Sequence, residues 1–597
     1  MPEKAKQNRV VLAIQLSKRA FGKYKWQIVI LTILGFVSGI LEGIGINALI
    51  PLFSFVLGEG EGGDDFVSQL IEQFFGAMNI RLSITYLLAF IIAAFLLKAV
   101  FTIFLEYIKI KITADYEEQT RNSLLDKILK ADWPHLLQQK IGYLETVMMI
   151  DITASANLLR QISTGITIIT GLFIYLLIAV NISFQITLIT LVLGLIFLLA
   201  IKPLIYKTKI ASFERTNLIK QTAHFVNENI LGIKTVKSMM VESGVRAKGE
   251  EYFSRLKKLW IRVAMLEQIS TSFVQPLSVI FISLIFAFSY KSANFNFGSI
   301  AAVMYLIHRI FVYIQQLQRT WHKFNTIFPH LKKTLDYEDA ATKNLEENAG
   351  SKKFNFKKEL VFQNVHFSYS DDRQVLSGVD FTLHKGKMLG LIGPSGGGKT
   401  TLVDIILRLL RPKKGEVLLD GEEISGIEMN EWRKNIGYVS QDIFLMNDTI
   451  ANNIRFYDSS ITEKEMEHAA KMANIYDHVM ELPEKYNTVI GERGVMLSAG
   501  QRQRIAIARV LARNPKILVL DEATSALDNH SEKEIQKVIN NLKGKVTILA
   551  IAHRLSTVRD SDAMIVLEGG KIIEKGDPKN LLRDKDSYFF KAYNIRD

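Results

Sequence analysis

Long apolar segments are the feature of this sequence that most limits what the chain can fold into. A helix needs about 20 predominantly apolar residues to cross the hydrocarbon core of a bilayer, and only helices or closed barrels satisfy every backbone polar group there. Six such segments occur before residue 320. They predict six transmembrane helices, at Ile28–Leu57, Ile84–Glu106, Ile162–Val180, Phe184–Ile205, Thr271–Tyr290 and Ser299–Leu317.

The segments between these spans indicate an orientation. Residues 107–161 and 206–270 are long, helix-like and rich in lysine and arginine, whereas the loop 58–83 is acidic and contains only Arg81 as a counter-charge. Loops rich in Lys and Arg stay in the cytoplasm, so we expect both termini and both long segments there. This topology accounts for much of the net charge of +13, and we expect no nucleic-acid partner.

The N-terminal segment 1–26 is basic and weakly amphipathic. It lacks an apolar core followed by a small-residue cleavage site, so we expect no cleaved signal peptide. It predicts an interfacial helix leading into the first span, with a frayed tail as the alternative. The chain contains no cysteine, which excludes disulfides, thiolate metal sites and a cysteine nucleophile.

The character of the sequence changes near residue 340. Residues 341–357 are polar and predict a linker between a membrane domain at 1–340 and a soluble domain at 358–597. In the soluble domain, short β-rich apolar runs alternate with helical segments, which is typical of an α/β fold with a mostly parallel sheet. The predicted fold class is therefore an all-α six-helix transmembrane domain followed by an α/β domain.

Residues 393–400, Gly-Pro-Ser-Gly-Gly-Gly-Lys-Thr, fit the phosphate-binding pattern G-x-x-x-x-G-K-[ST]. The pattern follows an apolar strand at Met388–Ile392 and opens a helix at Thr401–Leu410, which is the context that such a loop requires. Glycines let backbone N–H groups close around phosphates, and the helix N-terminus adds its positive end. We predict that Lys399 holds the β- and γ-phosphates and that Thr400 binds Mg²⁺.

A second apolar strand ends in two carboxylates, Asp521 and Glu522. A strand end beside the phosphate loop is where an acid associated with Mg²⁺ belongs, which indicates Asp521, and Glu522 is then placed to polarise the attacking water. Many strands end in acids, so this pair alone does not identify an activity.

Residues 497–501, Leu-Ser-Ala-Gly-Gln, lie just upstream of that strand and resemble the LSGGQ signature of ABC ATPases, with Ala499 in place of the first glycine. Other parts of the family pattern occur in order. Tyr369 resembles the aromatic residue that stacks on adenine, Gln441 the glutamine that senses Mg²⁺ and water, and His553 the switch histidine at the γ-phosphate. Residues 491–494 resemble an exporter-specific segment, and Ser525 to Asp528 resemble the D-loop.

The resemblance implies a P-loop ABC ATPase domain that binds ATP and Mg²⁺. It implies Glu522, His553 and Gln441 as catalytic residues, and Thr400, Gln441 and Asp521 as metal ligands. The nucleotide-binding residues that it implies are Tyr369, Gly393, Ser395, Gly396, Gly397, Gly398, Lys399, Thr400, Thr401, Ser498, Gly500, Gln501 and Asp521.

The membrane half resembles ABC exporters more loosely. Residues 121–151 and 228–237 resemble the stretches that hold the two coupling helices of that family. In this family one ATPase domain supplies the phosphate loop and a second supplies the signature, so a chain with one of each must pair. Because Glu522 and His553 are both present, we expect a homodimer in which ATP closes the ATPase domains and turns the membrane cavity outward.

The sequence says less about the transported substrate than about the nucleotide site. Glu42 lies in a glycine-rich run that ends at Pro51, a pattern that resembles bacterial exporters of glycolipids and lipid-linked oligosaccharides. A mid-span acid is costly unless it is solvated or paired, so Glu42 faces a cavity, a cation such as Lys98, or a neighbouring helix. Together with Lys202 near the inner mouth, these residues indicate an amphiphile with an anionic or sugar head, moved out of the cytoplasmic leaflet of a bacterial inner membrane.

Other functions stay open. Multidrug export is the main alternative, and Lys202, Lys207 and Lys209 also fit a role in topology alone. An ATP-gated channel or a regulatory subunit is a further possibility that the intact catalytic set disfavours. Fusion of the two domains in this order favours export over import.

Overall fold

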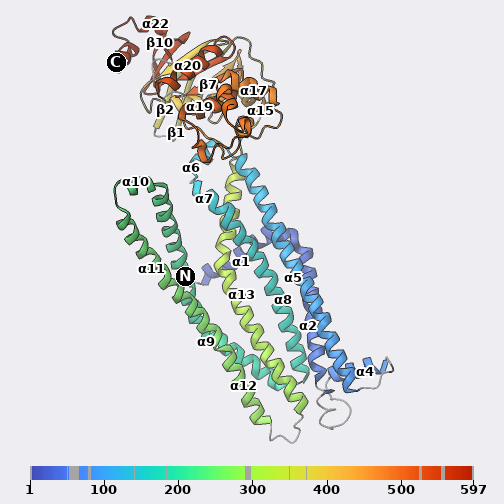
Figure 1. The fold of residues 1–597 in the computed structure, drawn as a ribbon. Helices are drawn as coiled ribbons and strands as arrows, with labels where there is room; N and C mark the ends of the chain where they lie inside the picture. Colours follow the sequence, from blue (N-terminus) through green and yellow to red (C-terminus); the bar gives the residue numbers. More distant parts are fainter. Residues whose placement is uncertain are drawn as a thin grey trace. The chain divides into compact units, whose positions relative to one another are not determined.

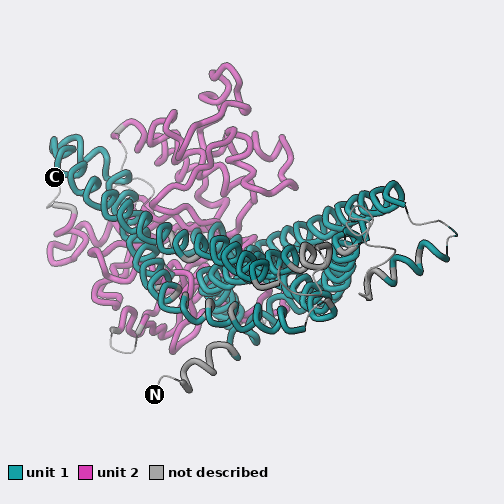
Figure 2. The backbone as a smooth tube through the Cα atoms, turned by 90° about the horizontal axis from the view of Figure 1, so that it is seen from below, with its two compact units in different colours: residues 1–130, 139–344 teal, residues 131–138, 345–597 magenta. Residues whose placement is uncertain are grey.

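A computed structural model of the chain forms two compact units (Figure 2). The first comprises residues 1–130 and 139–344, and the second comprises residues 131–138 and 345–597. The structure describes residues 3–49, 51–52, 66–77, 79, 83–139, 141–182, 184–289, 297–348, 350–370, 373–522, 528–552 and 558–594.

The first unit is helical throughout its described elements (Figure 1). Helices α2, α5, α8 and α13 pack along one another, and α9 packs along α11. The elements are α1 (Glu3–Phe21), η1 (Gly22–Tyr24), α2 (Lys25–Asn47), α4 (Phe66–Ala77), α5 (Ile84–Leu129), α7 (Ile141–Thr146), η2 (Val147–Asp151), α8 (Ile152–Ile182), α9 (Phe184–Leu231), α10 (Ile233–Ser238), α11 (Glu242–Ser272), α12 (Val274–Ser289) and α13 (Phe297–Lys343).

Three of these helices are much longer than a membrane is thick. Helices α5, α9 and α13 contain 46, 48 and 47 residues. At 1.5 Å per residue each is about 70 Å long, whereas the hydrocarbon core is about 30 Å thick. Each therefore extends well beyond the bilayer, and the extensions of α5 and α9 form the first part of the charged, helix-like segments 107–161 and 206–270 that the sequence predicted.

Four helical stretches are long and apolar enough to cross a membrane: Val11–Ile46, Ile84–Leu129, Tyr143–Asn181 and Glu242–Ala287. A shorter apolar helix covers Phe184–Ile196. The predicted sixth span lies within α13, whose hydropathy is lowered by charged and polar residues. Residues 53–57 and Tyr290, at the ends of the first and fifth predicted spans, lie outside the described residues, and the six-span arrangement stays a prediction.

The second unit contains two sheets. A six-stranded sheet has the order β10-β9-β3-β8-β7-β6, in which only β10 is antiparallel to its neighbour. A four-stranded antiparallel sheet has the order β2-β1-β4-β5. The strands are β1 (Glu359–Ser370), β2 (Arg373–His384), β3 (Met388–Ile392), β4 (Lys414–Leu419), β5 (Glu422–Glu423), β6 (Ile436–Val439), β7 (Ile517–Asp521), β8 (Thr547–Ile551), β9 (Ala563–Glu568) and β10 (Lys571–Gly576).

Two large apolar cores and a smaller cluster that contains Phe589 hold this unit together. One lies between the sheets and contains the fully buried Phe362, Phe381 and Trp432, and the other lies under α16, α17, α19 and α20. The helices are α6 (Trp133–Gln138), α14 (Lys399–Ile406), η3 (Ile424–Gly426), α15 (Met429–Asn435), α16 (Ile450–Arg455), α17 (Glu463–Met472), α18 (Tyr476–Glu481), η4 (Lys485–Asn487), η5 (Glu492–Gly494), α19 (Ala499–Leu511), α20 (Asn529–Leu542), α22 (Pro578–Leu581) and α23 (Tyr588–Asn594).

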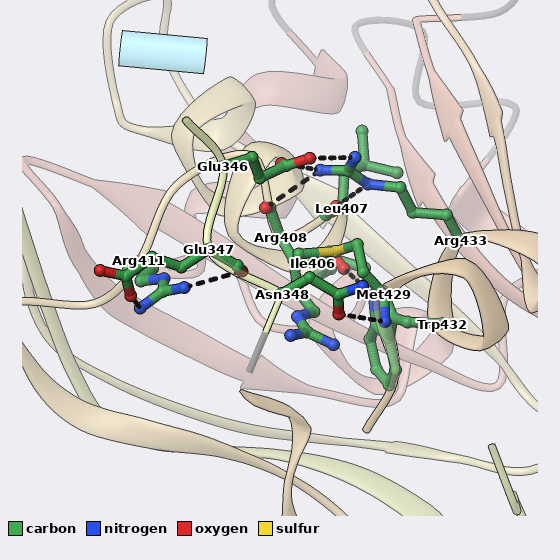
Figure 3. A network of polar contacts seen from close by, with 10 residues as sticks. All are labelled: Glu346, Glu347, Asn348, Ile406, Leu407, Arg408, Arg411, Met429, Trp432 and Arg433. Carbon is green, nitrogen blue, oxygen red and sulfur yellow. Dashed lines mark hydrogen bonds and ion pairs between the residues drawn. The ribbon is translucent and has the colours of Figure 1, made fainter. Parts of the chain in front are cut away.

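The start of the second unit is tied to its surface by a polar network (Figure 3). Residues 346–348 lie in the segment that the sequence predicted as a linker, yet each makes a side-chain contact with this unit. The Arg411 guanidinium lies 2.6 Å from Glu347, and the Met429 backbone N–H donates to Asn348 over 3.1 Å. Glu346 forms a bidentate pair with Arg433.

Candidate nucleotide-binding site

A candidate site is a cavity of about 820 Å³ in the second unit. It lies where the segments after β3, β6 and β7 meet, at the carboxyl ends of parallel strands, which is where α/β sheets bind ligands. The lining residues are Tyr369, Gln374, Val375, Ser395, Gly396, Gly398, Lys399, Thr400, Thr401, Gln441, Glu522, Gly569 and Gly570.

The loop 393–398 joins β3 to α14 in a conformation that needs glycine. Gly396 and Gly398 have positive φ angles of +78° and +101°, which side chains disfavour. A Cβ atom on Gly398 would lie 2.8 Å from the Leu376 side chain and 3.1 Å from the Val375 carbonyl oxygen. The loop therefore folds tightly against the second sheet and directs the N-terminus of α14 at the cavity.

Lys399 is the first residue of α14 and its side chain is buried. Its ammonium group donates to the carbonyl oxygens of Gly393 and Pro394 over 2.9 and 3.0 Å. Burial lowers the pKa of Lys399, and the negative charges of Glu522 and Asp521 oppose that shift. A buried cation held by neutral carbonyls at a cavity wall fits an anionic ligand such as a phosphate.

Glu522 reaches the same cavity from the end of β7. Its backbone is in the left-handed region, with a φ of +49°, which is strained for a residue with a side chain. Its backbone N–H donates to the Ile551 carbonyl over 3.0 Å, and its carboxylate accepts a hydrogen bond of 2.7 Å from the Gln441 amide. The strained turn and the amide together hold the carboxylate toward the cavity.

Asp521 is the last residue of β7 and its side chain is buried. It accepts a hydrogen bond of 3.3 Å from the Tyr438 hydroxyl. A further acid of α14, Asp404, is placed near it: burial and then the negative charge of Asp521 raise the pKa of Asp404 to about 6. Sequence reasoning missed Tyr438 and Asp404, because no motif signals either residue.

The residues present can supply oxygen ligands to Mg²⁺. The Thr400 hydroxyl, the Gln441 amide oxygen and the Asp521 carboxylate belong to three segments that meet at the cavity. Mg²⁺ is usually held by one or two protein groups together with water and substrate phosphates. Among the described residues no group of three or more His, Cys, Asp or Glu side chains forms a metal site by itself.

Tyr369 is exposed at the rim of the cavity, at the end of β1. Its hydroxyl lies 3.3 Å from the Thr401 hydroxyl, and its ring packs edge-on against Phe367 at 5.0 Å. An exposed ring that is fixed at one edge offers a face on which a base can stack.

The predicted signature residues lie elsewhere in the unit. Ser498 is the N-cap of α19 and forms a capping box with Gln501: the Ser498 hydroxyl accepts from the Gln501 N–H, and the Gln501 side chain accepts from the Ser498 N–H. A Cβ on Gly500 would lie 2.4 Å from the Ser531 hydroxyl, so glycine is required there. None of the three lines the 820 Å³ cavity.

Ala499, which departs from the signature pattern, is the first residue of α19 and packs partly buried against the second core. Replacing it with glycine is expected to destabilise the folded protein by about 1 kcal/mol, because glycine loses more backbone entropy in a helix. Since the methyl group faces the core, we expect ATP hydrolysis to change by less than about twofold. Chemical denaturation would measure the change in stability, and a phosphate-release assay would measure the change in hydrolysis. A tenfold change in hydrolysis would contradict the position of the Ala499 methyl group against the core.

Some predicted residues cannot be placed. His553 and Ser525 lie outside the described residues. Asp528, the last residue of the D-loop stretch, is described and caps α20 by accepting the N–H groups of His530 and Ser531 over 3.1 and 3.2 Å.

In the first unit, Glu42 lies at the centre of an ionic cluster. Its carboxylate is 2.8 Å from the Lys98 ammonium and 2.5 Å from the Arg309 guanidinium, and its side chain is only 5% exposed. The Arg309 guanidinium also lies over the rings of Tyr175 and Tyr313, at 5.6 and 5.3 Å. Two cations and one anion give this cluster a formal charge of +1.

The cluster joins two of the predicted substrate residues and leaves out the third. Lys98 pairs with Glu42, as the sequence suggested, whereas Lys202 is exposed on α9 and, among the described residues, forms no ion pair with either. Lys207 is also exposed, and the Lys209 side chain lies outside the described residues. Sequence reasoning did not identify Arg309 as a partner of Glu42. The available signal was that Arg309 is a cation inside a predicted span, where a charged side chain needs a partner.

Fold and site together define a membrane protein with a phosphate-loop nucleotide-binding domain. A profile of the ABC transporter transmembrane region matches residues 28–314, and a profile of the ABC transporter matches residues 376–525. The chain belongs to the ABC transporter family. It is an ATP-hydrolysing exporter that crosses the membrane several times, with the helical and α/β domains that the sequence predicted.

Several known proteins are similar to this chain. The chain is 31% identical to the heterocyst differentiation ATP-binding protein HepA of a Nostoc species over 79% of each chain. It is 36% identical to the ATP-dependent lipid A-core flippase of Saccharophagus degradans over 63% of this chain and 64% of that one. A bacterial Atm1-family ABC exporter with ATP bound has the same fold, with a TM-score of 0.76 and 22% identity over 96% of this chain and 99% of that chain.

Proposed function

We propose that two copies of this chain form a homodimer that binds each ATP between the phosphate loop of one copy and the signature of the other. The observation that carries this proposal is the separation of the two motifs: the cavity is lined by Lys399, Thr400 and Glu522, and by none of the signature residues. A site that lacks its signature within one chain is completed by a second copy.

A long helical arm in the first unit supports pairing. Helices α9 and α11 run side by side to α10, and the apolar side chains of Leu231, Met239 and Met240 at this end are largely exposed. The segment is rich in lysine and arginine and is expected in the cytoplasm. Exposed apolar groups in water mark an interaction surface, which fits contact with the second copy.

Complementation between two defective chains tests the composite site. Lys399→Ala removes the phosphate-loop cation and Ser498→Arg blocks the signature, so each homodimer should be inactive. A mixed dimer retains one intact site only if each site takes its two motifs from different copies. We expect the mixed dimer, purified with two different tags, to recover a large part of wild-type ATPase activity in nanodiscs. Inactivity of the mixed dimer would refute the composite arrangement, provided that a mixed dimer of wild type with Lys399→Ala is active.

The positions of the side chains suggest how hydrolysis proceeds. Lys399 and the loop N–H groups hold the phosphates and balance the charge that builds up on the γ-phosphate. Glu522, oriented by Gln441, polarises the attacking water and accepts its proton as the bond from water to the γ-phosphorus forms and the bond from that phosphorus to the leaving ADP oxygen breaks. Mg²⁺, when bound, supplies further positive charge, and Thr400, Gln441 and Asp521 offer the oxygen atoms that hold it.

We infer that the substrate is an amphiphile with an anionic or sugar head, moved out of the cytoplasmic leaflet of a bacterial inner membrane. The Glu42 cluster supports this inference, because it carries a net positive charge and its two cations, Lys98 and Arg309, are about one-quarter exposed. One similar protein is a lipid A-core flippase.

ATPase activity in lipid nanodiscs tests the substrate class. A glycolipid or lipid-linked sugar should stimulate hydrolysis by wild type, and Arg309→Met should remove the stimulation while leaving basal hydrolysis intact. Equal stimulation of wild type and Arg309→Met would contradict a role of the cluster in binding. Stimulation only by unrelated apolar drugs would instead favour the multidrug exporter.

A further inference from the structure

Gln374 is a polar residue of the nucleotide cavity that belongs to none of the family motifs. It is exposed near the start of β2, and its Cα pairs across the sheet with that of Ser368, the neighbour of Tyr369. The next residue, Val375, lies beside the phosphate loop, because a Cβ on Gly398 would be 3.1 Å from the Val375 carbonyl oxygen. Gln374 therefore lies between the ring that can stack on a base and the loop that can hold phosphates.

The side-chain amide of Gln374 has a fixed orientation. Its nitrogen lies 3.3 Å from the Leu376 carbonyl oxygen and 3.0 Å from Nδ1 of His366. A backbone carbonyl oxygen only accepts hydrogen bonds, so the atom that faces it is the amide nitrogen and not the amide oxygen. The two amide hydrogens are then directed at the carbonyl and at the imidazole.

His366 is held in turn by a second contact. Because its Nδ1 accepts from Gln374, the proton of the neutral ring is on Nε2, which donates to Asn364 Oδ1 over 3.0 Å. The Asn364 backbone N–H donates to the Asp380 carboxylate over 2.7 Å, and Gly378 leaves room for the Asn364 side chain, since a Cβ there would be 3.2 Å from Oδ1. The Gln374 amide is thus held by a relay of side chains that do not line the cavity.

This arrangement leaves the amide oxygen of Gln374 for a ligand. Among the residues that the structure describes, Oε1 of Gln374 has no hydrogen-bond partner. A carbonyl oxygen can only accept, so its partner on a nucleotide is a donor. Ionised phosphate oxygens are acceptors, whereas the ribose, which joins the base to the phosphates, carries two hydroxyl donors.

We propose that the Gln374 side-chain oxygen accepts a hydrogen bond from a ribose hydroxyl of ATP, and that His366 is the positioning residue that turns this oxygen toward the nucleotide. The proposal rests on the cavity being the ATP site, with the base on Tyr369 and the phosphates on the loop 393–398. It makes the site selective for ribonucleotides over nucleotides that lack ribose hydroxyl groups.

Equilibrium binding of ATP and of 2′,3′-dideoxyATP to the full-length protein in nanodiscs, without Mg²⁺ so that hydrolysis does not intervene, tests the contact. Wild type should bind ATP about three- to tenfold more tightly, as expected for one neutral hydrogen bond. Gln374→Met keeps the length of the side chain and removes the acceptor, so it should lose affinity for ATP alone and bind both nucleotides equally. Gln363→Met is the matched control, because Gln363 is exposed on β1 and does not line the cavity, and its preference for ATP should equal that of wild type.

His366→Leu tests the positioning role. It leaves Gln374 in place and removes the acceptor that holds the amide nitrogen, so the amide can rotate. The preference for ATP should fall below about twofold, while the affinity for 2′,3′-dideoxyATP stays at the wild-type value, which a general loss of structure would not produce. A wild-type preference in His366→Leu would overturn the positioning role.

Two further outcomes would overturn the ribose contact itself. One is a preference for ATP that persists in Gln374→Met. The other comes from purine riboside triphosphate, which lacks the 6-amino donor of adenine: if Gln374→Met removes discrimination against this analogue instead, the oxygen accepts from the base. Lys399→Ala tests the underlying site separately. It should weaken binding of ATP and of the dideoxy analogue alike, and wild-type binding by Lys399→Ala would place the nucleotide elsewhere and overturn both the site and the contact.

Discussion

Replacing Glu522 with glutamine is expected to lower kcat for ATP hydrolysis by about 10²- to 10⁴-fold, the usual contribution of a positioned general base. The carboxylate lies at the cavity wall, held by a strained backbone with a φ of +49° and by a hydrogen bond of 2.7 Å from the Gln441 amide. Glutamine has nearly the same shape but accepts no proton at neutral pH. ATP affinity should therefore persist, because Lys399 and the loop 393–398 are untouched.

The measurement is single-turnover hydrolysis by the purified dimer, with nucleotide binding followed separately. Glu522→Gln should retain ATP and release almost no phosphate. Gln441→Ala is the informative companion, because it keeps the base and removes the group that orients it, and we expect an intermediate loss. Hydrolysis by Glu522→Gln within about tenfold of wild type would exclude Glu522 as the base and direct attention to another group at the cavity.

Replacing Glu42 with alanine is expected to be the most destabilising single change in the membrane half. It removes the only anion of its ionic cluster and leaves Lys98 and Arg309 close together without a counter-charge. Breaking a buried ion pair by removing one partner typically costs about 3–5 kcal/mol, and here two like charges would be left. We expect a lower yield of folded protein and a clearly lower temperature of unfolding in nanodiscs.

The geometry also predicts the order of effects among the cluster residues. Arg309→Met should be milder than Glu42→Ala, since Glu42 keeps its contact of 2.8 Å with Lys98 and the methionine still packs beside Tyr175 and Tyr313. Thr102→Ala serves as the control, because Thr102 is exposed one turn along α5 and its hydroxyl donates only to a carbonyl of its own helix. If Glu42→Ala unfolds at the same temperature as Thr102→Ala, the cluster contributes nothing to stability.

The fold class was predictable because its signals are local. Apolar length indicated membrane helices, and alternation of β-rich runs with helical segments indicated the α/β domain. The run that contains Phe362 is one of these β-rich runs and forms strand β1, but it belongs to an antiparallel sheet separate from the mostly parallel one. Strand propensity says that a segment is extended, whereas its partner strand is chosen by packing with residues far along the chain.

The candidate site was predictable to a similar extent. The loop 393–400 is contiguous, and its strand-to-helix context can be read from neighbouring residues, so the sequence located it. The support from Tyr438 and Asp404 was not predictable, because a tyrosine in a strand and an aspartate in a helix carry no distinctive pattern. The capping box between Ser498 and Gln501 fits the pattern of serine followed three residues later by glutamine, which is a signal within one turn of helix.

The sequence by itself determined the class of protein, and it predicted the membrane segments and the residues of the nucleotide site, since each of these signals depends on residues within a few turns of one another. Only the tertiary structure decided which distant side chains meet. Gln441 contacts Glu522 across 81 residues, and Arg309 contacts Glu42 across 267. Such pairs form because helix packing and strand order bring separate segments together, and no local periodicity encodes that choice.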